Sequence, residues 1–369
     1  MTVKKFTAAA LVICAALSLF DIVCRADDTP QISAECAVVA DGSGELLFEK
    51  EPDKRMLIAS TTKIMTALVT LENCDIYEAV EIAPESVGVE GSSIYLKNGE
   101  KVTVLELLYG VLLESGNDAA AALAYHVAGG IAEFAEMMNE RAGSLGLDNT
   151  HFTNPHGLDD EGHYSSAADL AIIMAEAIKN DAFRRITSTK SVSIGGRTFS
   201  NHNKLLSSYS GVFGGKTGYT KSAGRILVTC CERDGLCLIC VTINAPDDWT
   251  DHATLYDWAF GRFKSERVTD AGTVFYKMPV ISGTEEYVEV TAERELTLTV
   301  LSGDEVKTRV ILPKFVYAPV ERGSLAGRVD VYVNGKYRES VKLFYSAGRR
   351  SVSDGKNTFT ENNTAVVSL

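Results

Sequence analysis

A serine and a lysine three residues apart could form an activated nucleophile near the start of a helix. Ser60 and Lys63 lie in the segment 58–66. The residues that follow them have the apolar spacing of an amphipathic helix, at Ile64, Ala67, Leu68 and Leu71. Positions i and i+3 lie on the same side of a helix, so the amine could take the hydroxyl proton. Burial on the apolar side lowers the pKa of a lysine, and this lets its amine act as a base.

The spacing alone is weak evidence, because it is expected about once by chance in a chain of this size. Ser353 and Lys356 repeat it in a polar segment near the C-terminus, and we assign that pair no role. The alternative for Lys63 is a surface lysine whose stem lies along apolar residues while its charge stays in water.

Two further motifs contain hydroxyl, amide and amine groups that could face one cleft. Ser115, Gly116 and Asn117 fall between two predicted helices, where these residue types also serve simply as helix caps. Segment 214–220 carries a lysine and a threonine among glycines, which allow a close backbone approach. A substrate could lie along this segment as an added strand. The alternative is an edge strand protected by its lysine.

The elements that carry these motifs separate into strand runs and helix runs. Thr103 with Glu106 forms a capping box, and Ser166 with Asp169 begins a later helix. The pattern predicts an α+β domain over residues 27–263, an antiparallel sheet with an inserted helical block. The expected strands are 35–40, 45–49, 191–194, 197–200, 214–220, 225–231 and 236–243, and a helix over 251–263 closes the domain.

The remaining third of the chain has a different pattern. Residues 264–272 are polar and are predicted to be a linker. Residues 273–345 alternate apolar and polar positions, and Asn334 with Gly335 is a strong hairpin turn, so a small all-β domain is predicted. Residues 346–369 are polar, without helical periodicity or a membrane-anchor pattern, and are predicted to be a disordered tail.

Composition and the N-terminus limit the function classes. A chain of 369 residues with 46% hydrophobic content suits two folded units. The formal net charge of -13 argues against nucleic acid as a partner. Lys4 and Lys5 precede an apolar run over 6–20 and a small-x-Ala pattern that ends at Ala26. This predicts a signal peptide over 1–26 and an extracytoplasmic location, with an uncleaved anchor as the alternative.

Six cysteines remain after the signal segment, and an exported protein could pair them. Cys230, Cys231, Cys237 and Cys240 lie in two strand patterns and are interpreted as mostly free core thiols, with a cross-strand pair left open. Cysteines three apart on a strand point to opposite faces, which disfavours zinc there. The histidines within 151–163 lack a zinc-binding helix motif. We therefore expect no metal and no cofactor.

The three motifs occur in the order and contexts described for penicillin-binding serine enzymes. The chain resembles the serine-type D-alanyl-D-alanine carboxypeptidases, low-molecular-mass penicillin-binding proteins of the peptidase S11 kind, over roughly residues 30–345. The resemblance implies a β-lactamase/transpeptidase-like fold and hydrolysis of the terminal D-Ala-D-Ala bond of peptidoglycan stem pentapeptides. It extends to the segments 113–120, 150–158, 163–166, 201–206, 214–219 and 223–224, and in the β domain to 318–320 and Gly323.

The resemblance implies a catalytic role for four residues. Ser60 would be the acylated nucleophile and Lys63 its general base. Ser115 would relay the proton to the departing D-alanine. The backbone N–H groups of Ser60 and Tyr219 would form the oxyanion hole.

The resemblance also implies how the substrate is held. Asn117 would bind its peptide amide, Lys216 would supply positive potential, and Thr217 would bind its terminal carboxylate, with Gly218 and Tyr219 completing the strand. The expected partners are stem peptides and β-lactam antibiotics, and the expected state is a monomer.

Other functions fit the residues less well. No Gly-x-Ser-x-Gly elbow is present, so an α/β-hydrolase is disfavoured. A β-lactamase would need an efficient deacylating base, for which no glutamate stands out, and the extra β domain also argues against it. A non-catalytic peptidoglycan- or penicillin-sensing module is the alternative from another class, and loss of a motif residue would have favoured it.

Overall fold

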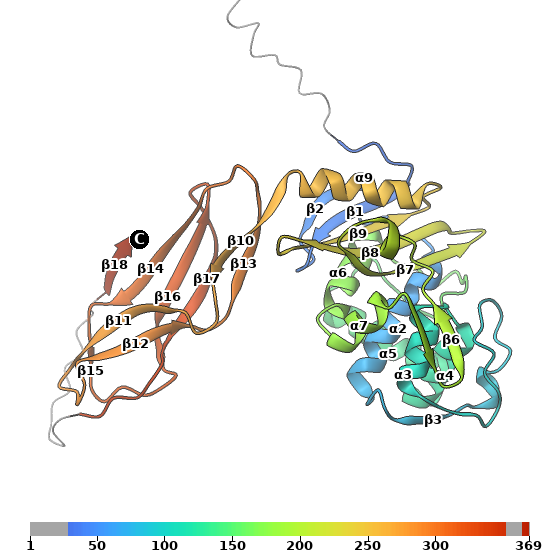
Figure 1. Ribbon diagram of the computed structural model, residues 1–369, viewed down its shortest axis with the longest axis horizontal. Helices are drawn as coiled ribbons and strands as arrows, with labels where there is room; N and C mark the ends of the chain where they lie inside the picture. Colours follow the sequence, from blue (N-terminus) through green and yellow to red (C-terminus); the bar gives the residue numbers. More distant parts are fainter. Residues whose placement is uncertain (1–28, 352–363, 369) are drawn as a thin grey trace, which may run out of the picture. The chain divides into compact units, whose positions relative to one another are not determined.

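The computed structural model describes residues 29–351 and 364–368 (Figure 1). The predicted signal segment 1–26 and the greater part of the polar tail, 352–363, lie outside the described residues. Within the described part of the chain, no helix combines the length and the apolar character that a membrane crossing requires.

An antiparallel five-stranded sheet forms the frame of the first domain, in the order β2-β1-β9-β8-β7. Its first two strands come from the start of the domain and the others from its end, so β1 pairs with β9 across some 200 residues of sequence. The predicted sheet of N- and C-terminal elements is confirmed. The bounds are β1 (Cys36–Asp41), β2 (Leu46–Lys50), β7 (Val212–Thr220), β8 (Gly224–Arg233) and β9 (Leu236–Ile243).

Helices cover both faces of this sheet (Figure 1). Helix α9 (Asp248–Phe260) contacts β8 and β9, and the inserted block contacts the sheet mainly through α6 (Ala167–Ala177). The rest of the block consists of η1 (Ala59–Thr62), α2 (Lys63–Asn73), η2 (Pro84–Ser86), α3 (Val104–Leu112), α4 (Asn117–Ala128), α5 (Ile131–Ser144), α7 (Asp181–Ser188) and α8 (Leu205–Ser208). Two small hairpins accompany it, β3 (Ala79–Glu81) with β4 (Lys101–Thr103) and β5 (Ser191–Ile194) with β6 (Arg197–Ser200).

Helix α2 lies at the centre of the block, and its first eight residues are all buried. It contacts α3, α4, α5, α6 and α7, so it is apolar on nearly every side, as expected of a helix inside a core. Full burial of each large aliphatic side chain contributes about 1.5–3 kcal/mol. This packing fixes the position of the residue at the start of the helix, Lys63.

The predicted helix caps are confirmed. The backbone N–H of Glu106 donates to Thr103 Oγ1 at 3.2 Å, and the N–H of Asp169 donates to Ser166 Oγ at 3.1 Å. Each cap satisfies one of the N–H groups that a helix start leaves without an intrahelical partner. They set where α3 and α6 begin.

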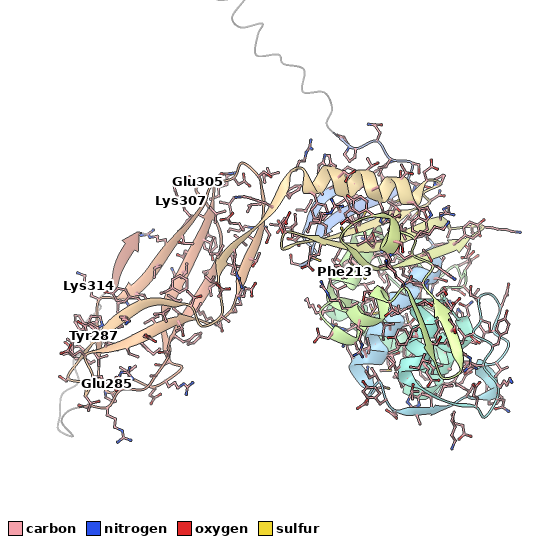
Figure 2. The ribbon with its side chains drawn as sticks, in the orientation of Figure 1. Phe213, Glu285, Tyr287, Glu305, Lys307 and Lys314 are labelled. Carbon is pink, nitrogen blue, oxygen red and sulfur yellow. The ribbon has the colours of Figure 1, made fainter. Side chains whose placement is uncertain are left out.

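The second domain is all-β, as predicted, and contains a seven-stranded sheet in the order β15-β11-β12-β17-β16-β14-β18. Valines and leucines of alternate positions form its own core. The ion pair of Glu305 and Lys307 lies on its exposed surface (Figure 2). The predicted turn at Asn334 and Gly335 joins β16 to β17, with positive φ at both residues. The bounds are β11 (Val274–Ile281), β12 (Tyr287–Ala292), β14 (Val306–Pro313), β15 (Val316–Tyr317), β16 (Leu325–Val333), β17 (Lys336–Tyr345) and β18 (Thr364–Ser368).

Two boundary predictions were wrong. The predicted linker 264–272 is mostly strand β10 (Phe263–Thr269), which pairs with β13 (Leu296–Leu301). Most side chains of this strand are only half-buried, so its sequence is polar and does not show the apolar alternation that predicts a strand. The predicted disordered tail contains strand β18, which pairs with β14 through a short apolar run.

Candidate active site

Ser60 and Lys63 meet at the junction of η1 and α2. The Lys63 Nζ lies 3.1 Å from Ser60 Oγ, and the lysine side chain is fully buried. Two carbonyl oxygens also accept from this amine, Asn117 Oδ1 at 2.7 Å and the backbone carbonyl of His156. Carbonyl oxygens only accept hydrogen bonds. The two hydrogens of a neutral amine would therefore go to them, and its lone pair would face the Ser60 hydroxyl.

Two buried lysines control the electrostatics. Burial, and in second place the positive charge of Lys216, holds the pKa of Lys63 well below its usual value, against a smaller opposing effect of Asp118. Burial lowers the pKa of Lys216 to about 7. Among the described residues, neither lysine has a carboxylate within ion-pair distance. The Asp118 carboxylate instead accepts from the backbone N–H groups of Ile94 and Leu96.

Two histidines that the predicted site did not include hold the start of α2, the half-buried His156 and the buried His163. His163 Nε2 lies 2.7 Å from Thr62 Oγ1, and the His156 carbonyl binds Lys63. Burial lowers the pKa of His156 to about 3 and that of His163 to about 4, so both rings are neutral at neutral pH. Gly157 has a φ of +83°, and a Cβ there would lie 1.9 Å from the Ala59 carbonyl oxygen. Only glycine therefore lets this loop close over the nucleophile turn.

Ser115 precedes α4 with a φ of 62°, which is unusual for a residue with a side chain. Its Oγ is buried and has no hydrogen-bond partner. A buried unpaired hydroxyl costs about 1–3 kcal/mol, and left-handed backbone adds to this. Ser115 lines the same cleft as Ser60, so its unpaired hydroxyl is available to form a hydrogen bond with a molecule bound there.

Asn117 begins α4, and both polar atoms of its side chain bind protein groups. Its Oδ1 accepts from Lys63, and its Nδ2 donates to the Glu90 carbonyl. Its backbone N–H donates to the Ser92 carbonyl at 2.7 Å. The residue thus ties the loop at 90–92 to the Lys63 amine, and it is not among the residues that line the cleft. Its predicted binding of the substrate's peptide amide stays a prediction.

Strand β7 supplies the other wall. Lys216 points inward, and its Nζ donates to the Thr217 carbonyl at 2.8 Å, whereas Thr217, Gly218 and Tyr219 line the cleft. The Gly218 Cα lies against the nucleophile turn, since a Cβ there would come within 3.3 Å of the Ser60 backbone N. β7 is the last strand of its sheet. One side of it is therefore available to an extended peptide.

The cleft has a volume of about 390 Å³. Its lining contains five of the eight predicted site residues, and Lys63, Asn117 and Lys216 lie behind it. Sequence reasoning missed the remaining lining residues, Ser92, His202, Lys204, Asp248 and Trp249, and treated Arg225 as structural. Segment 201–206 had been noted as resembling the family, but Asp248 and Trp249 belong to no motif.

Arg225 is both structural and part of the cleft wall. Its guanidinium donates to both carboxylate oxygens of Asp248, at 2.8 and 2.9 Å, and lies over the Trp249 ring. This pair fixes the start of α9 against β8. Among the described residues, potential metal ligands gather at Cys74, Glu78 and His126, outside the cleft lining.

The predicted cysteine chemistry is consistent with the packing. All six cysteines of the described residues are free in this structure, and none takes part in the cross-strand disulfide that had been left open. Cys230, Cys231 and Cys240 are buried. Burial raises the pKa of Cys231 to about 11 and that of Cys237 to about 12, which keeps both thiols protonated and unreactive.

Comparison with known proteins identifies two families in succession. Residues 24–247 match the D-alanyl-D-alanine carboxypeptidase family, and residues 263–348 match the C-terminal domain of penicillin-binding protein 5. The chain is 30% identical over 328 residues to D-alanyl-D-alanine carboxypeptidase DacF of Bacillus subtilis, covering 85% of this chain and 84% of that protein. It is 34% identical over 332 residues to DacA of Haemophilus influenzae, with 85% and 84% covered.

Solved structures agree with this. Penicillin-binding protein 5 from Haemophilus influenzae superposes with a TM-score of 0.73 at 33% identity, covering 87% of this chain and 99% of that one. The family resemblance and the fold predicted from the motifs are confirmed. The chain belongs to the D-alanyl-D-alanine carboxypeptidase family.

Proposed function

We propose that this protein hydrolyses the terminal D-Ala-D-Ala bond of peptidoglycan stem pentapeptides through an acyl-enzyme on Ser60, and that penicillins acylate the same serine. The observation that carries the proposal is the buried Lys63 amine, 3.1 Å from Ser60 Oγ and bound to two carbonyl oxygens. Family membership supplies the substrate class. The product, a stem tetrapeptide, can no longer donate to a cross-link, so the activity limits cross-linking.

Acylation begins with proton transfer from Ser60 Oγ to the neutral Lys63 amine. The oxygen attacks the carbonyl carbon of the penultimate D-alanine, and an oxyanion forms. The backbone N–H groups of Ser60 and Tyr219 are assigned to stabilise it, which is worth about 2.7–4 kcal/mol per donor in comparable sites. Gly218 allows strand β7 to lie close to the Ser60 turn, because a Cβ at that position would press on the turn.

Departure of D-alanine needs a proton on its amine. Ser115 has a free hydroxyl that can accept the proton from Lys63 and pass it to the leaving nitrogen as the C–N bond breaks. Thr217 is assigned to the terminal carboxylate, with the charge of Lys216 behind it. Water then attacks the ester and gives its proton to Lys63, and the Ser60 oxygen leaves and recovers a proton.

The site of action is also a proposal. Enzymes of this family act on cell-wall peptides, and the predicted signal peptide over 1–26 would export the chain. N-terminal sequencing of the secreted protein tests the cleavage after Ala26. Light scattering or ultracentrifugation tests the expected monomer.

The decisive experiment measures D-alanine release from a stem pentapeptide. Wild type should release it, and Ser60→Ala should not. Ser353→Ala is the matched control, because it removes the serine of the other pair with the same spacing and should leave the rate unchanged. Equal rates for wild type and Ser60→Ala would refute the assignment.

Labelled penicillin separates the alternatives. A stable adduct at Ser60 is expected. Rapid turnover of the drug would identify a β-lactamase, and absence of labelling would identify a non-catalytic module.

A further inference from the structure

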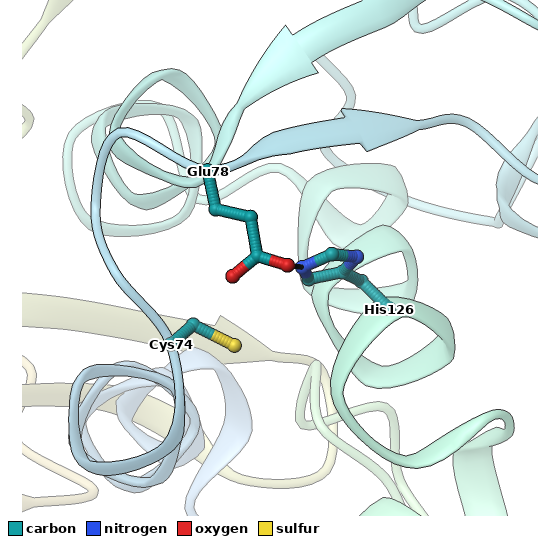
Figure 3. A group of neighbouring side chains, drawn as sticks. All are labelled: Cys74, Glu78 and His126. Carbon is teal, nitrogen blue, oxygen red and sulfur yellow. Dashed lines mark ion pairs between the residues drawn. The ribbon is translucent and has the colours of Figure 1, made fainter.

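Three potential metal ligands converge at the far ends of two helices that begin at the active site (Figure 3). Cys74 directly follows α2, His126 lies in the last turn of α4, and Glu78 directly precedes β3. The Cys74 Sγ, a Glu78 carboxylate oxygen and a His126 ring nitrogen all lie within 4.8 Å of one another. None of the three lines the catalytic cleft.

The donor set and its spacing suit zinc. One thiolate, one imidazole and one carboxylate are usual zinc ligands, whereas Ca²⁺ and Mg²⁺ prefer oxygen alone. The Glu78 Oε1 to His126 Nε2 distance is 3.3 Å. Two such ligands around tetrahedral zinc lie about 3.4 Å apart, given Zn–N and Zn–O distances near 2.1 Å. The Cys74 Sγ lies within 4.8 Å of both atoms, so it must move by up to about 1.2 Å to reach the separation that a shared zinc ion requires.

The backbone around the cluster is held in place. The Glu78 N–H donates to the Asp75 carbonyl at 3.0 Å, and the Glu78 carbonyl accepts from the Val104 N–H at 3.0 Å. The Cys74 N–H donates to the Thr70 carbonyl at 3.0 Å. Both helix ends carry partial negative charge, which favours a cation between them. Cys74 is only partly buried, and Glu78 is half-exposed, so an ion can enter from solvent.

We propose that Cys74 Sγ, the Glu78 carboxylate and His126 Nε2 bind one Zn²⁺ ion, with water as the fourth ligand. The thiol proton is released to solvent when the Zn–S bond forms. The ion joins the end of α2, which begins at Lys63, to the end of α4, which begins at Asn117. Zinc therefore stabilises the pair of helices that carry the Lys63–Asn117 hydrogen bond.

The test is metal titration of the untagged protein after treatment with EDTA. Calorimetry with Zn²⁺ should give one site per chain and a rise in melting temperature with zinc concentration. Co²⁺ should give the near-ultraviolet thiolate charge-transfer band of a cysteine-ligated ion. Cys74→Ser should abolish this band, and both Cys74→Ser and His126→Gln should weaken zinc binding by about tenfold or more.

Cys237→Ser is the matched control, because it removes a partly buried thiol of β9 that is not part of the cluster. It should bind zinc as wild type does. Alkylation mapping of the wild-type protein avoids any folding defect of a variant, and zinc should protect Cys74. The proposal is overturned if wild type binds no zinc at millimolar concentration, if Cys74→Ser keeps wild-type affinity, or if zinc leaves the alkylation of Cys74 unchanged.

Discussion

Replacement of Lys216 by methionine should change how stability depends on pH. Lys216 is 2% exposed, has no carboxylate partner among the described residues, and has a pKa lowered by burial to about 7 from 10.5. In the unfolded chain its pKa returns to the ordinary value. Methionine has a similar length and no charge, so it removes this titration while keeping most of the packing.

The sign of the effect follows from proton counts. Between pH 7 and 10 the unfolded state holds the proton on Lys216 and the folded state does not, so wild-type stability rises with pH in that window. The slope approaches 1.36 kcal/mol per pH unit for one proton. From pH 7.5 to 9.5 wild type should therefore gain about 2.5 kcal/mol relative to Lys216→Met.

Urea unfolding at several pH values measures this difference, because the other titrating groups are common to both proteins and, among them, the pKa of Lys63 depends on the charge of Lys216. If the difference in free energy of unfolding between wild type and Lys216→Met stayed constant from pH 7.5 to 9.5, the inference that Lys216 is buried without a compensating charge would be refuted. Catalysis gives a second readout. Loss of the cation as pH rises through 7 should raise the wild-type KM for carboxylate-bearing peptides, and Lys216→Met should lack this dependence.

Three other substitutions test the site. Ser115→Ala should lower kcat about 10²–10⁴-fold while leaving urea stability unchanged or raised, since the lost hydroxyl is unpaired. Gly218→Ala should slow D-alanine release about 10²-fold by displacing the Ser60 turn. The control Gly143→Ala, in open space on α5, should leave the rate unchanged and raise the free energy of unfolding by about 0.5–1 kcal/mol. Arg225→Met should lower the free energy of unfolding, measured with heat or urea, by about 1–3 kcal/mol, because it leaves the buried Asp248 carboxylate without its cation. Unchanged rates for Ser115→Ala or Gly218→Ala, or unchanged stability for Arg225→Met, would contradict these readings.

Local chemistry made much of the fold predictable. The caps at Thr103 and Ser166 and the turn at Asn334 act within a few residues, so their signals are present in short windows. Strand β10 was missed for the opposite reason. Its identity depends on pairing with β13, some 30 residues away, and its own polar residues give no alternation to read.

The motifs predicted a nucleophile, Ser60, but not the groups that surround it. The His156 carbonyl reaches Lys63 across 93 residues of sequence, and a backbone group leaves no signature in residue type. The resemblance implied a substrate-binding role for Asn117, but no motif indicated that its two polar atoms would also bind Lys63 and the Glu90 carbonyl. Only the packing of α2 against α4 decides which of these partners the amide meets.

The environments of the two lysines support their different roles independently of the motifs. When two like groups lie close together in a buried site, one holds its charge and the other is neutral, and the difference between their surroundings decides which. Burial alone lowers the pKa of Lys216, whereas burial and the charge of Lys216 together lower that of Lys63. These surroundings favour Lys63 as the base proposed beside Ser60. Lys216, with a pKa of about 7, holds part of its charge at neutral pH and can supply the positive potential proposed behind the substrate carboxylate.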